Sequence, residues 1–498
     1  MSLRRLRALD SGAGNSIGSE RESGRRRWGT IGRVLLLLAI LSIVLVSANL
    51  YVGRLAALPA PFIDDLANAE NIMRLLVISP HPDDEVIAAG GLMQQVLQRG
   101  GEVRVVIVTS GDGSLTGTMV EFRRPPRSTD YIQSGLNRQQ ESLRALATLG
   151  VAPGMVEFLG YPDRGIQALW WNYWEDTDPY RSPFTRLAHS PYPLTYNPSS
   201  VYSGQSLLAD LRTILSQFQP DTVVAPHFED SHPDHWATGA FAALALAMER
   251  PDPMPRLLLY LVHRGDFPTP RGYLPFAPLL PPLRLVNDGV YWQKLTLTDE
   301  LVRVKGEAME QHRSQLPLLG AFLRSFVRQN ELFCELNYAG ALMLVEDQPV
   351  TPVVTDWVLA DEAELRPVLW DSVGDTLTQE LGPGTDFVAL YVATTAEEVW
   401  IAAELRGGSS PLVEYRAFVR AADGENASRA RVLYPVRLMP RPRDQARGRF
   451  LLARFRLDEL SNPHTVVVSF EAAYPRGRVV DRIGWIAVSL EDQAVPAF

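Results

Sequence analysis

Between residues 73 and 265, short apolar runs alternate with stretches whose apolar positions recur at helical spacing. The runs are near-continuously hydrophobic, which is typical of strands buried on both faces of a parallel sheet. Strands alternating with helices predict an α/β domain with a mostly parallel sheet flanked by helices. The predicted strands cover 75–79, 102–113, 156–165, 222–227 and 256–263, the second and third including a turn or loop, and the predicted helices cover 85–100, 137–150, 206–220 and 234–250.

Two long segments, 114–136 and 166–200, interrupt this alternation. The second contains LWWNYWEDTDPY, a stretch with three tryptophans and two tyrosines. Loops of this length inside a compact domain are usually lids, binding loops or disordered segments. We therefore interpret both segments as loops of one of these kinds.

After about residue 350 the pattern changes to short strand-like stretches separated by glycine, proline and asparagine, without a convincing long helix. This pattern predicts an all-β sandwich over 350–498, as an accessory domain behind an α/β domain over 73–349. The strand-like stretches are DFVALYVATTAEEVWIAAELRG, LVEYRAFVRAA, RARVLYPVRL, GRFLLARFRL, HTVVVSFEAAYP and RIGWIAVSL.

A third pattern occupies the beginning of the chain. Residues 34–52, VLLLLAILSIVLVSANLYV, run for 19 residues without charge, long enough to cross a bilayer as a helix. The basic segment 1–33 holds eight arginines and three acidic residues, which predicts a cytoplasmic N-terminus and a protein body outside the cytoplasm. The alternative is a cleaved signal peptide, because VSA at 46–48 resembles a cleavage site. Residues 53–72 would link this single-pass transmembrane anchor to the α/β domain.

Composition narrows the classes of function. The net charge of -9 argues against a general nucleic-acid-binding surface, so no nucleic-acid partner is expected. The hydrophobic fraction of 46% is enough for substantial cores in a chain of 498 residues. Cys334 is the single cysteine, which excludes an intrachain disulfide framework and a zinc site built from thiolates alone.

The candidate chemistry gathers after two of the predicted strands. SPHPDDE follows the first strand and contains His81, Asp83 and Asp84, whereas APHFEDSHPDH ends the fourth and contains the other candidates, His232, Asp234 and His235. Ligands of open α/β sheets bind outside the carboxyl ends of the strands, so both loops are expected at one edge. Either motif alone could be a helix N-cap, but their occurrence together at two strand ends favours a metal site.

Zinc catalysis requires about three histidine or carboxylate ligands, with one position left for water. His81, one of the two aspartates and His235 can supply them, while the other aspartate acts as general base. His232, as an imidazolium, could stabilise the oxyanion or protonate the leaving amine, and Asp234 could orient a histidine. Zinc is expected, although iron, manganese and nickel also accept such ligands.

The remaining histidines are weaker candidates. His227 could line the pocket, because it stands directly at the end of the fourth predicted strand. His189, His263 and His464 have no partner in the sequence, and we expect them to be surface or satisfied core residues.

These motifs resemble those of the PIG-L/LmbE-like N-deacetylase family, in which a (P/A)HPDDE loop is paired with a distal HxDH. Weaker matches are TSGDG at 109–113, RQQE at 138–141, FLGYPDRG at 158–165 and KGEAMEQHRSQ at 305–315, so the resemblance covers about 73–335. It implies a Rossmann-like sheet and removal of acyl groups, typically acetyl, from amino-sugar conjugates. It also implies that His81, Asp84 and His235 bind zinc, that Asp83 is the general base, and that His232 acts on the tetrahedral intermediate.

The resulting hypothesis is a membrane-anchored, zinc-dependent N-deacetylase acting on an amino-sugar, glycan or glycolipid substrate. One alternative is a non-catalytic glycan-binding surface protein, because tryptophan faces in the aromatic segment 166–180 could stack on sugars. The other is a metal-dependent amidase or esterase that uses the same site on a substrate without a sugar.

Overall fold

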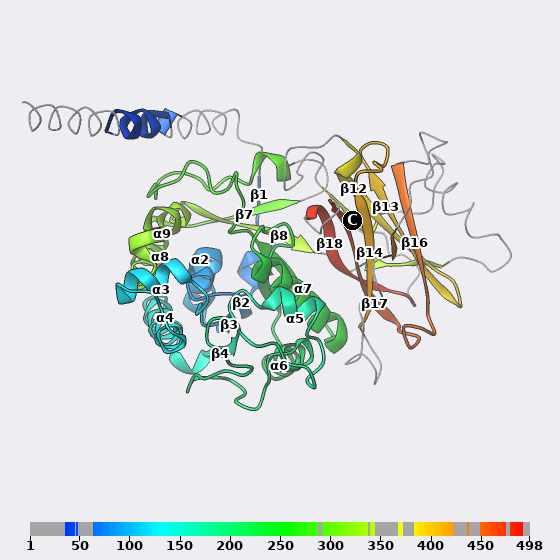
Figure 1. Cartoon of the computed structure of the whole chain (residues 1–498), viewed down its shortest axis with the longest axis horizontal. Coiled ribbons are helices and arrows are strands. Elements are labelled where there is room, and N and C mark those ends of the chain that lie inside the picture. The colour runs from blue at the N-terminus through cyan, green and yellow to red at the C-terminus, as the bar shows by residue number, and fades with distance from the viewer. Residues whose placement is uncertain are drawn as a thin grey trace, which may run out of the picture. The chain divides into compact units, whose positions relative to one another are not determined.

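The structure is a computed structural model, and its chain divides into two compact units, Met1–Pro59 and Ala60–Phe498. The second unit contains the sheets (Figure 1). The residues that the structure describes are 35–44, 46–47, 63–286, 291–336, 339–343, 367–371, 383–422, 436–437, 449–474 and 479–491.

An eight-stranded sheet forms the α/β part, in the order β1-β7-β8-β6-β5-β2-β3-β4. The five neighbours from β6 to β4 are all parallel, which confirms the predicted parallel core. Strand β8 is antiparallel to both β6 and β7. Strands β1, β7 and β8, which the sequence pattern did not predict, extend the sheet beyond β6. The strands are β1 (Asp64–Asp65), β2 (Arg74–Ser79), β3 (Glu102–Thr109), β4 (Val156–Tyr161), β5 (Thr222–Pro226), β6 (Arg256–Tyr260), β7 (Trp292–Thr296) and β8 (Asn330–Leu336).

The order of the strands brings the two motif loops together. From β2 the chain adds β3 and β4 on one side of the sheet, and it then crosses to β5 on the other side of β2. Strands β2 and β5 are paired in parallel register, with Val77 opposite Val224. The loops after β2 and β5 therefore leave the same edge at a topological switch point, where α/β sheets bind their ligands.

The described helices of the α/β part are α2 (Asp84–Gln98), α3 (Leu115–Phe122), α4 (Ser128–Thr148), α5 (Ile166–Trp171), α6 (Gly204–Phe218), α7 (Pro233–Glu249), α8 (Asp299–Met309) and α9 (Leu316–Leu323) (Figure 1). The interpretation of 114–136 and 166–200 as loops is therefore wrong in part, because the first contains α3 and the start of α4 and the second contains α5. The glycine and threonines of α3 are poor helix formers, but Ser114 caps the helix by accepting the Gly117 N–H at 3.2 Å.

The Gly90-Gly91 pair lets the backbone of α2 lie close to the side chains of Leu297 and Lys305. A Cβ on Gly91 would lie 2.4 Å from Leu297, and a Cβ on Gly90 would lie 3.2 Å from Lys305. Glu331 accepts the Gly91 N–H at 2.7 Å and pairs with the buried Lys305 at 2.6 Å. A buried ion pair thus fixes the helix where a side chain would not fit.

Two five-stranded sheets make up the C-terminal part, which confirms the predicted all-β character of this region. One sheet contains β10 (Leu342–Met343), β11 (Leu369–Trp370), β12 (Phe387–Thr394), β13 (Glu398–Leu405) and β16 (Phe450–Arg456). The other contains β9 (Ala339–Gly340), β14 (Glu414–Ala421), β15 (Val436–Arg437), β17 (Thr465–Ala473) and β18 (Val479–Ser489). Both β9 and β10 precede residue 350, so this region also recruits residues from before the predicted boundary.

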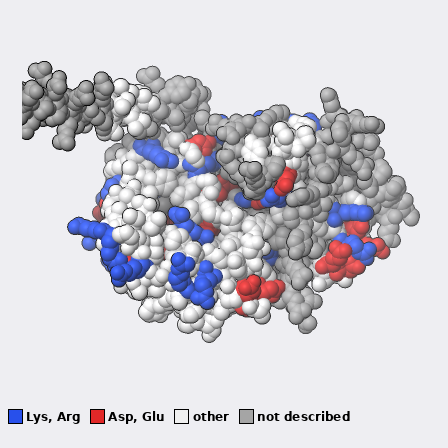
Figure 2. Space-filling model, viewed as in Figure 1, with Lys and Arg blue, Asp and Glu red and all other residues white. Residues whose placement is uncertain are grey.

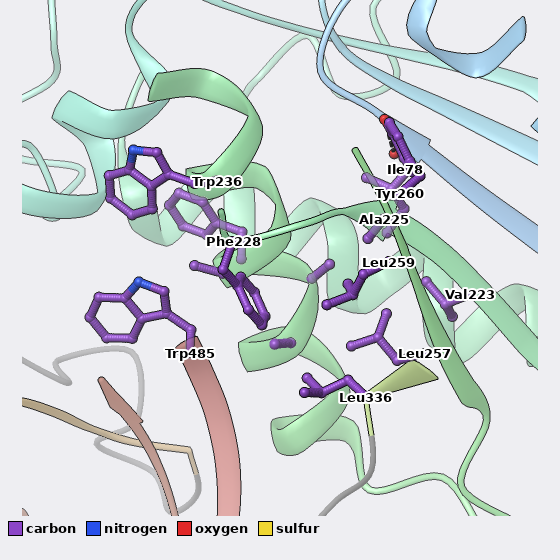
Figure 3. Packing of buried hydrophobic residues seen from close by; sticks show 14 of the residues in the cluster. Ile78, Val223, Ala225, Phe228, Trp236, Leu257, Leu259, Tyr260, Leu336 and Trp485 are labelled. Atoms are coloured by element: carbon purple, nitrogen blue, oxygen red, sulfur yellow. Dashed lines mark hydrogen bonds between the residues drawn. The ribbon is translucent and has the colours of Figure 1, made fainter. Parts of the chain in front are cut away.

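The aromatic segment joins the two parts of this unit. Trp170 is fully buried, and its ring lies 4.9 Å from that of Trp485 on β18. The guanidinium of Arg482 lies 4.1 Å from the ring of Trp236 on α7. Figure 3 shows Phe228, Trp236 and Trp485 gathered beside α7, away from the apolar residues of the parallel strands. The tryptophans of this segment therefore pack against the sandwich as part of the core.

We expect Trp485→Ala to destabilise the protein by about 3–5 kcal/mol, because it empties a fully buried indole site. A lower midpoint of thermal unfolding would show the effect. Tyr291→Ala is the control, since that side chain is 74% exposed and should leave the midpoint nearly unchanged. Equal midpoints for Trp485→Ala and wild type would contradict a packing role for the indole.

The predicted membrane anchor is contradicted. Residues 35–44 and 46–47 are helical. Among the described residues, no helix combines the length and the apolarity of a membrane span. This finding overturns the predicted single-pass location with the protein body outside the cytoplasm. Residues 1–34 and the rest of 34–52 lie outside the described part, as do residues 53–62 of the predicted linker.

Charge is dispersed on the face shown in Figure 2. Basic and acidic side chains form several small groups on its described surface, some of them containing both signs, with uncharged surface between the groups. The net charge of -9 is thus not gathered into one acidic patch on this face.

Candidate metal centre

The loop between β2 and α2 has a constrained backbone. Asp83 has a φ of 122°, a left-handed conformation that is strained for a residue with a side chain. Its N–H donates to Glu85 Oε2 at 2.9 Å, and Arg138 donates to the carbonyl of Pro82 at 2.7 Å. These contacts hold the loop so that His81 and Asp84 face the centre while Asp83 faces Arg138.

The loop between β5 and α7 is organised by Asp230. One carboxylate oxygen accepts the N–H groups of Val262 and His263, at 3.0 and 2.9 Å, which ties this loop to the end of β6. The other oxygen accepts the N–H of His232 at 2.8 Å. Helix α7 then starts at Pro233, a residue that fits the first helical turn, where its missing N–H costs nothing.

Three side-chain atoms from the two loops form a nearly equilateral triangle. Asp84 Oδ2 lies 3.1 Å from His81 Nδ1 and 3.1 Å from His235 Nε2, and the two nitrogens are 3.2 Å apart. Ligands at the usual zinc distances of 2.0–2.1 Å around a tetrahedral centre are about 3.3 Å apart. The donor types and their spacing therefore suit a single divalent ion.

Carboxylates stand behind both imidazoles of the triangle. His235 Nδ1 is 3.1 Å from Asp230 Oδ2, so Asp230 can fix the tautomer that leaves Nε2 with its lone pair. His81 Nε2 lies 3.3 Å from both Asp163 and Asp234, which leaves Nδ1 for the centre. Metal-binding histidines usually have such partners, which orient the ring. Asp234 thus lies within reach of His81, and the orienting role suggested by the sequence stays a prediction.

The two neighbouring aspartates have opposite electrostatics. Burial raises the pKa of Asp83 to about 8, with Arg138 opposing the shift and Asp84 adding to it. Burial would also raise the pKa of Asp84, but the charge and hydrogen bond of His235 hold it well below its usual range. Such a separation distinguishes a carboxyl that can accept a proton from one that stays ionised.

Positive charge is concentrated at the centre itself. Burial opposes it, but hydrogen bonds to Asp163, Asp234 and Asp84 raise the pKa of His81 well above its usual value. Asp230 and Asp84 likewise raise the pKa of His235 to about 9 against the effect of burial. The carboxylates thus favour cationic charge between the loops, and a divalent ion would displace these protons.

His232 is not the imidazolium that we expected. Burial and the charges of His81, His235 and His263 lower the pKa of His232 to about 2. Its Nδ1 also accepts the N–H of Asp234 at 3.3 Å as the cap of α7, a contact that requires a lone pair on that nitrogen. The helix N-terminus further disfavours a cation at this position. Both observations favour a neutral ring whose Nε2 carries the hydrogen.

The other candidate histidines fall into two groups: three lie away from the motif residues, and one lies beside them. His227 is buried, stacks on Trp292 at 5.6 Å and accepts the N–H of Glu229, contacts that do not involve the motif residues. His189 and His464 are exposed, as expected. The expectation for His263 is wrong, because its ring lies 4.6 Å from that of His235.

Four residues at the centre were missed as site residues: Arg138, Asp163, Asp230 and His263. Arg138 and Asp163 belong to RQQE and YPDRG, which were recognised only as supporting matches. Asp230 lies inside the second motif, five residues before His235, and an acidic residue so close to a candidate ligand was the available signal. His263 carries no local signal, since it reaches the centre only through the pairing of β6 with β5.

Three groups among the described residues offer ligand atoms within 4.8 Å of one another: His81 with His232 and His235, Asp84 with His235 and His263, and His81 with Asp163 and Asp234. They overlap at one location. The candidate site residues predicted from the two motifs are therefore brought together, with Asp83 beside them.

We expect Asp230→Asn to weaken metal binding by about 10–100-fold, because the amide no longer supplies the negative charge behind His235. Competition with a chromogenic chelator would measure the affinity. Asp221→Asn, which also changes a carboxylate bonded to backbone N–H groups but lies away from the centre, should leave it unchanged. Equal affinity of Asp230→Asn and wild type would remove Asp230 from the metal site.

Comparison with known proteins identifies related sequences. Residues 76–246 match the family described as PIG-L: GlcNAc-PI de-N-acetylase, a range that includes both motif loops. A 1D-myo-inositol 2-acetamido-2-deoxy-alpha-D-glucopyranoside deacetylase from Mycobacterium sp. (strain KMS) is 32% identical over 188 residues. This match covers 37% of the present chain and 53% of the relative, so the chain spans about half the length of that protein.

Two further matches cover a larger share of the related protein than the mycobacterial match does. The deacetylase of the same description from Corynebacterium diphtheriae is 26% identical over 289 residues, which are 56% of this chain and 86% of that protein. The solved N,N'-diacetylchitobiose deacetylase from Pyrococcus horikoshii matches with 23% identity and a TM-score of 0.35, over 54% of this chain and 86% of that one.

Proposed function

We propose that this protein, whose residues 76–246 match the PIG-L family, is a metal-dependent N-deacetylase that removes the acetyl group from an amino-sugar substrate. The observation that carries the proposal is the triangle of His81 Nδ1, Asp84 Oδ2 and His235 Nε2, with edges of 3.1–3.2 Å. These three residues would hold the metal. Zinc fits the two nitrogens and one carboxylate, and Fe²⁺ or another divalent ion is compatible with the same donors.

A divalent ion at this position supplies Lewis-acid chemistry, which polarises an amide carbonyl and lowers the pKa of a water molecule. The protein's own part begins with Asp83, whose raised pKa suits a general base. Asp83 takes a proton from the attacking water and can return it to the leaving amine. Arg138, 3.3 Å from Asp83 Oδ2, keeps the carboxylate oriented.

His232 supports the step in which the carbonyl oxygen becomes negative. With Nδ1 engaged by the N–H of Asp234, the neutral ring presents Nε2–H as a donor. A fixed donor near a developing oxyanion contributes more in a buried site than it would in water. His232 is thus proposed as an oxyanion donor in its neutral form.

The substrate class follows from the relatives, which are described as deacetylases of an acetamido-glucopyranoside linked to inositol. The alternative of a glycan-binding protein loses its main support, because Trp170 and Trp174 are buried and Trp171 lies 4.7 Å from Phe418 of the sandwich. The deacetylase proposal places the sugar's acetamido group at the triangle, with Asp83 and His232 on the reacting carbonyl.

Acetate release from the purified, metal-loaded chain tests the proposal. The substrates would be N-acetylglucosaminyl-inositol, free N-acetylglucosamine, an N-acetylated peptide and an acetate ester. We expect acetate from the amino sugars, abolished by a chelator and restored by Zn²⁺ or Fe²⁺. Turnover confined to the peptide or the ester would replace the proposal with the amidase or esterase alternative, and metal-loaded protein without any turnover would refute it.

A further inference from the structure

A further candidate side chain reaches the centre from the loop after β6. His263 follows β6, three residues after its last residue, Tyr260. Its ring centroid lies 4.6 Å from that of His235 and 5.1 Å from that of His232. Ligand atoms of His263, His235 and Asp84 all lie within 4.8 Å of one another, and two of these three residues belong to the proposed metal triangle.

The position of His263 is held by the residue that also supports His235. Asp230 accepts the N–H of His263 at 2.9 Å and lies 3.1 Å from His235 Nδ1, so one carboxylate sets the relation of both histidines. The carbonyl of His263 accepts the N–H of Ser231 at 2.7 Å, which adds a second link between the two loops. A nearly parallel contact with Phe322, at 5.6 Å and 14°, restrains the plane of the ring.

We propose that His263 is a fourth protein ligand of the metal, beside His81, Asp84 and His235. This inference rests on the proposed function, because it concerns the same ion. Catalytic zinc sites usually have three protein ligands and an open position for water. A fourth protein ligand raises the coordination number to at least five when water is present, and it favours ions that accept five or six ligands over strictly tetrahedral ones.

Cobalt substitution tests the proposal, because the visible absorption of Co²⁺ becomes weaker as its coordination number rises. The variant is His263→Phe, which preserves an aromatic ring against Phe322 but removes both nitrogens. We expect stronger visible absorption in the Co²⁺ form of the variant and an affinity for Zn²⁺ lower by at least about tenfold. His263→Ala, measured in parallel, shows whether the phenyl ring itself changes the site, because alanine removes the nitrogens without adding a ring.

His227→Phe is the matched control. His227 also stands at the end of a central parallel strand and stacks on an aromatic ring, Trp292, yet the candidate metal groups of the described residues do not include it. The Co²⁺ absorption spectrum and the Zn²⁺ affinity of His227→Phe should equal those of the wild type.

Unchanged Co²⁺ absorption and unchanged Zn²⁺ affinity in both His263 variants would overturn the proposal. This holds even if KM changed, because His263 would then face the substrate. Wild-type protein that binds no metal would instead refute the proposed function.

Discussion

Asp83→Asn is expected to lower kcat by about 10²–10⁴-fold while the metal content stays the same. The reason lies in the geometry, since Asp83 faces Arg138 at 3.3 Å and is absent from the triangle of ligand atoms. Asparagine keeps the shape of the side chain but cannot accept a proton from water. Steady-state kinetics, together with metal analysis of the same preparation, would measure both quantities.

The control for this prediction is another buried carboxyl. Asp210 is buried, and burial raises its pKa as well. It accepts hydrogen bonds from Tyr161, Ser200 and Asn197, away from the centre. Asp210→Asn should keep kcat close to the wild-type value. If Asp83→Asn lost the metal in proportion to its activity, Asp83 would be a ligand and the division of roles between Asp83 and Asp84 would be wrong.

His81→Ala is expected to abolish both metal binding and turnover, because it removes one corner of the triangle. The effect can be followed without substrate. A metal at 100 times its Kd stabilises a protein by about 2.7 kcal/mol, so Zn²⁺ should raise the thermal midpoint of the wild type. It should leave the midpoint of His81→Ala unchanged.

His189→Ala is the matched control for His81→Ala, because His189 is exposed and lies outside the candidate metal groups of the described residues. Zn²⁺ should raise its thermal midpoint as in the wild type. Asp84→Ala should behave like His81→Ala, since Asp84 Oδ2 contacts both imidazoles. Zinc-dependent stabilisation that survived in both His81→Ala and Asp84→Ala would move the metal away from the triangle.

Local patterns predicted the parallel core well. Each of the five predicted strands is present, because a near-continuous apolar run such as LLVIS suits a strand that is buried on both faces of a sheet. The same patterns missed α3, whose residues have weak helix propensity, and the antiparallel strands β7 and β8, whose pairing joins distant parts of the chain. Local periodicity thus predicted elements but not the full extent of the sheet.

The aromatic segment shows where composition misleads. Trp170, Trp171 and Trp174 together resemble a sugar-binding loop, yet Arg420 lies 4.3 Å from the ring of Trp170 and donates to its carbonyl at 2.6 Å. The partner of this segment is a strand about 250 positions away in the chain. Surface exposure, which decides between core and binding loop, is a property of tertiary packing.

By itself the sequence determined the elements of the parallel core and the six motif residues from His81 to His235, because ligand types and helical or strand periodicity are local properties. Only the tertiary structure brought Asp84 rather than Asp83 against His81 and His235, lowered the pKa of His232 through burial, and brought Asp163, Asp230 and His263 beside the motif residues. The physical reason is that strand order and burial, which set distances and charges between residues far apart in the chain, leave no periodic trace in it.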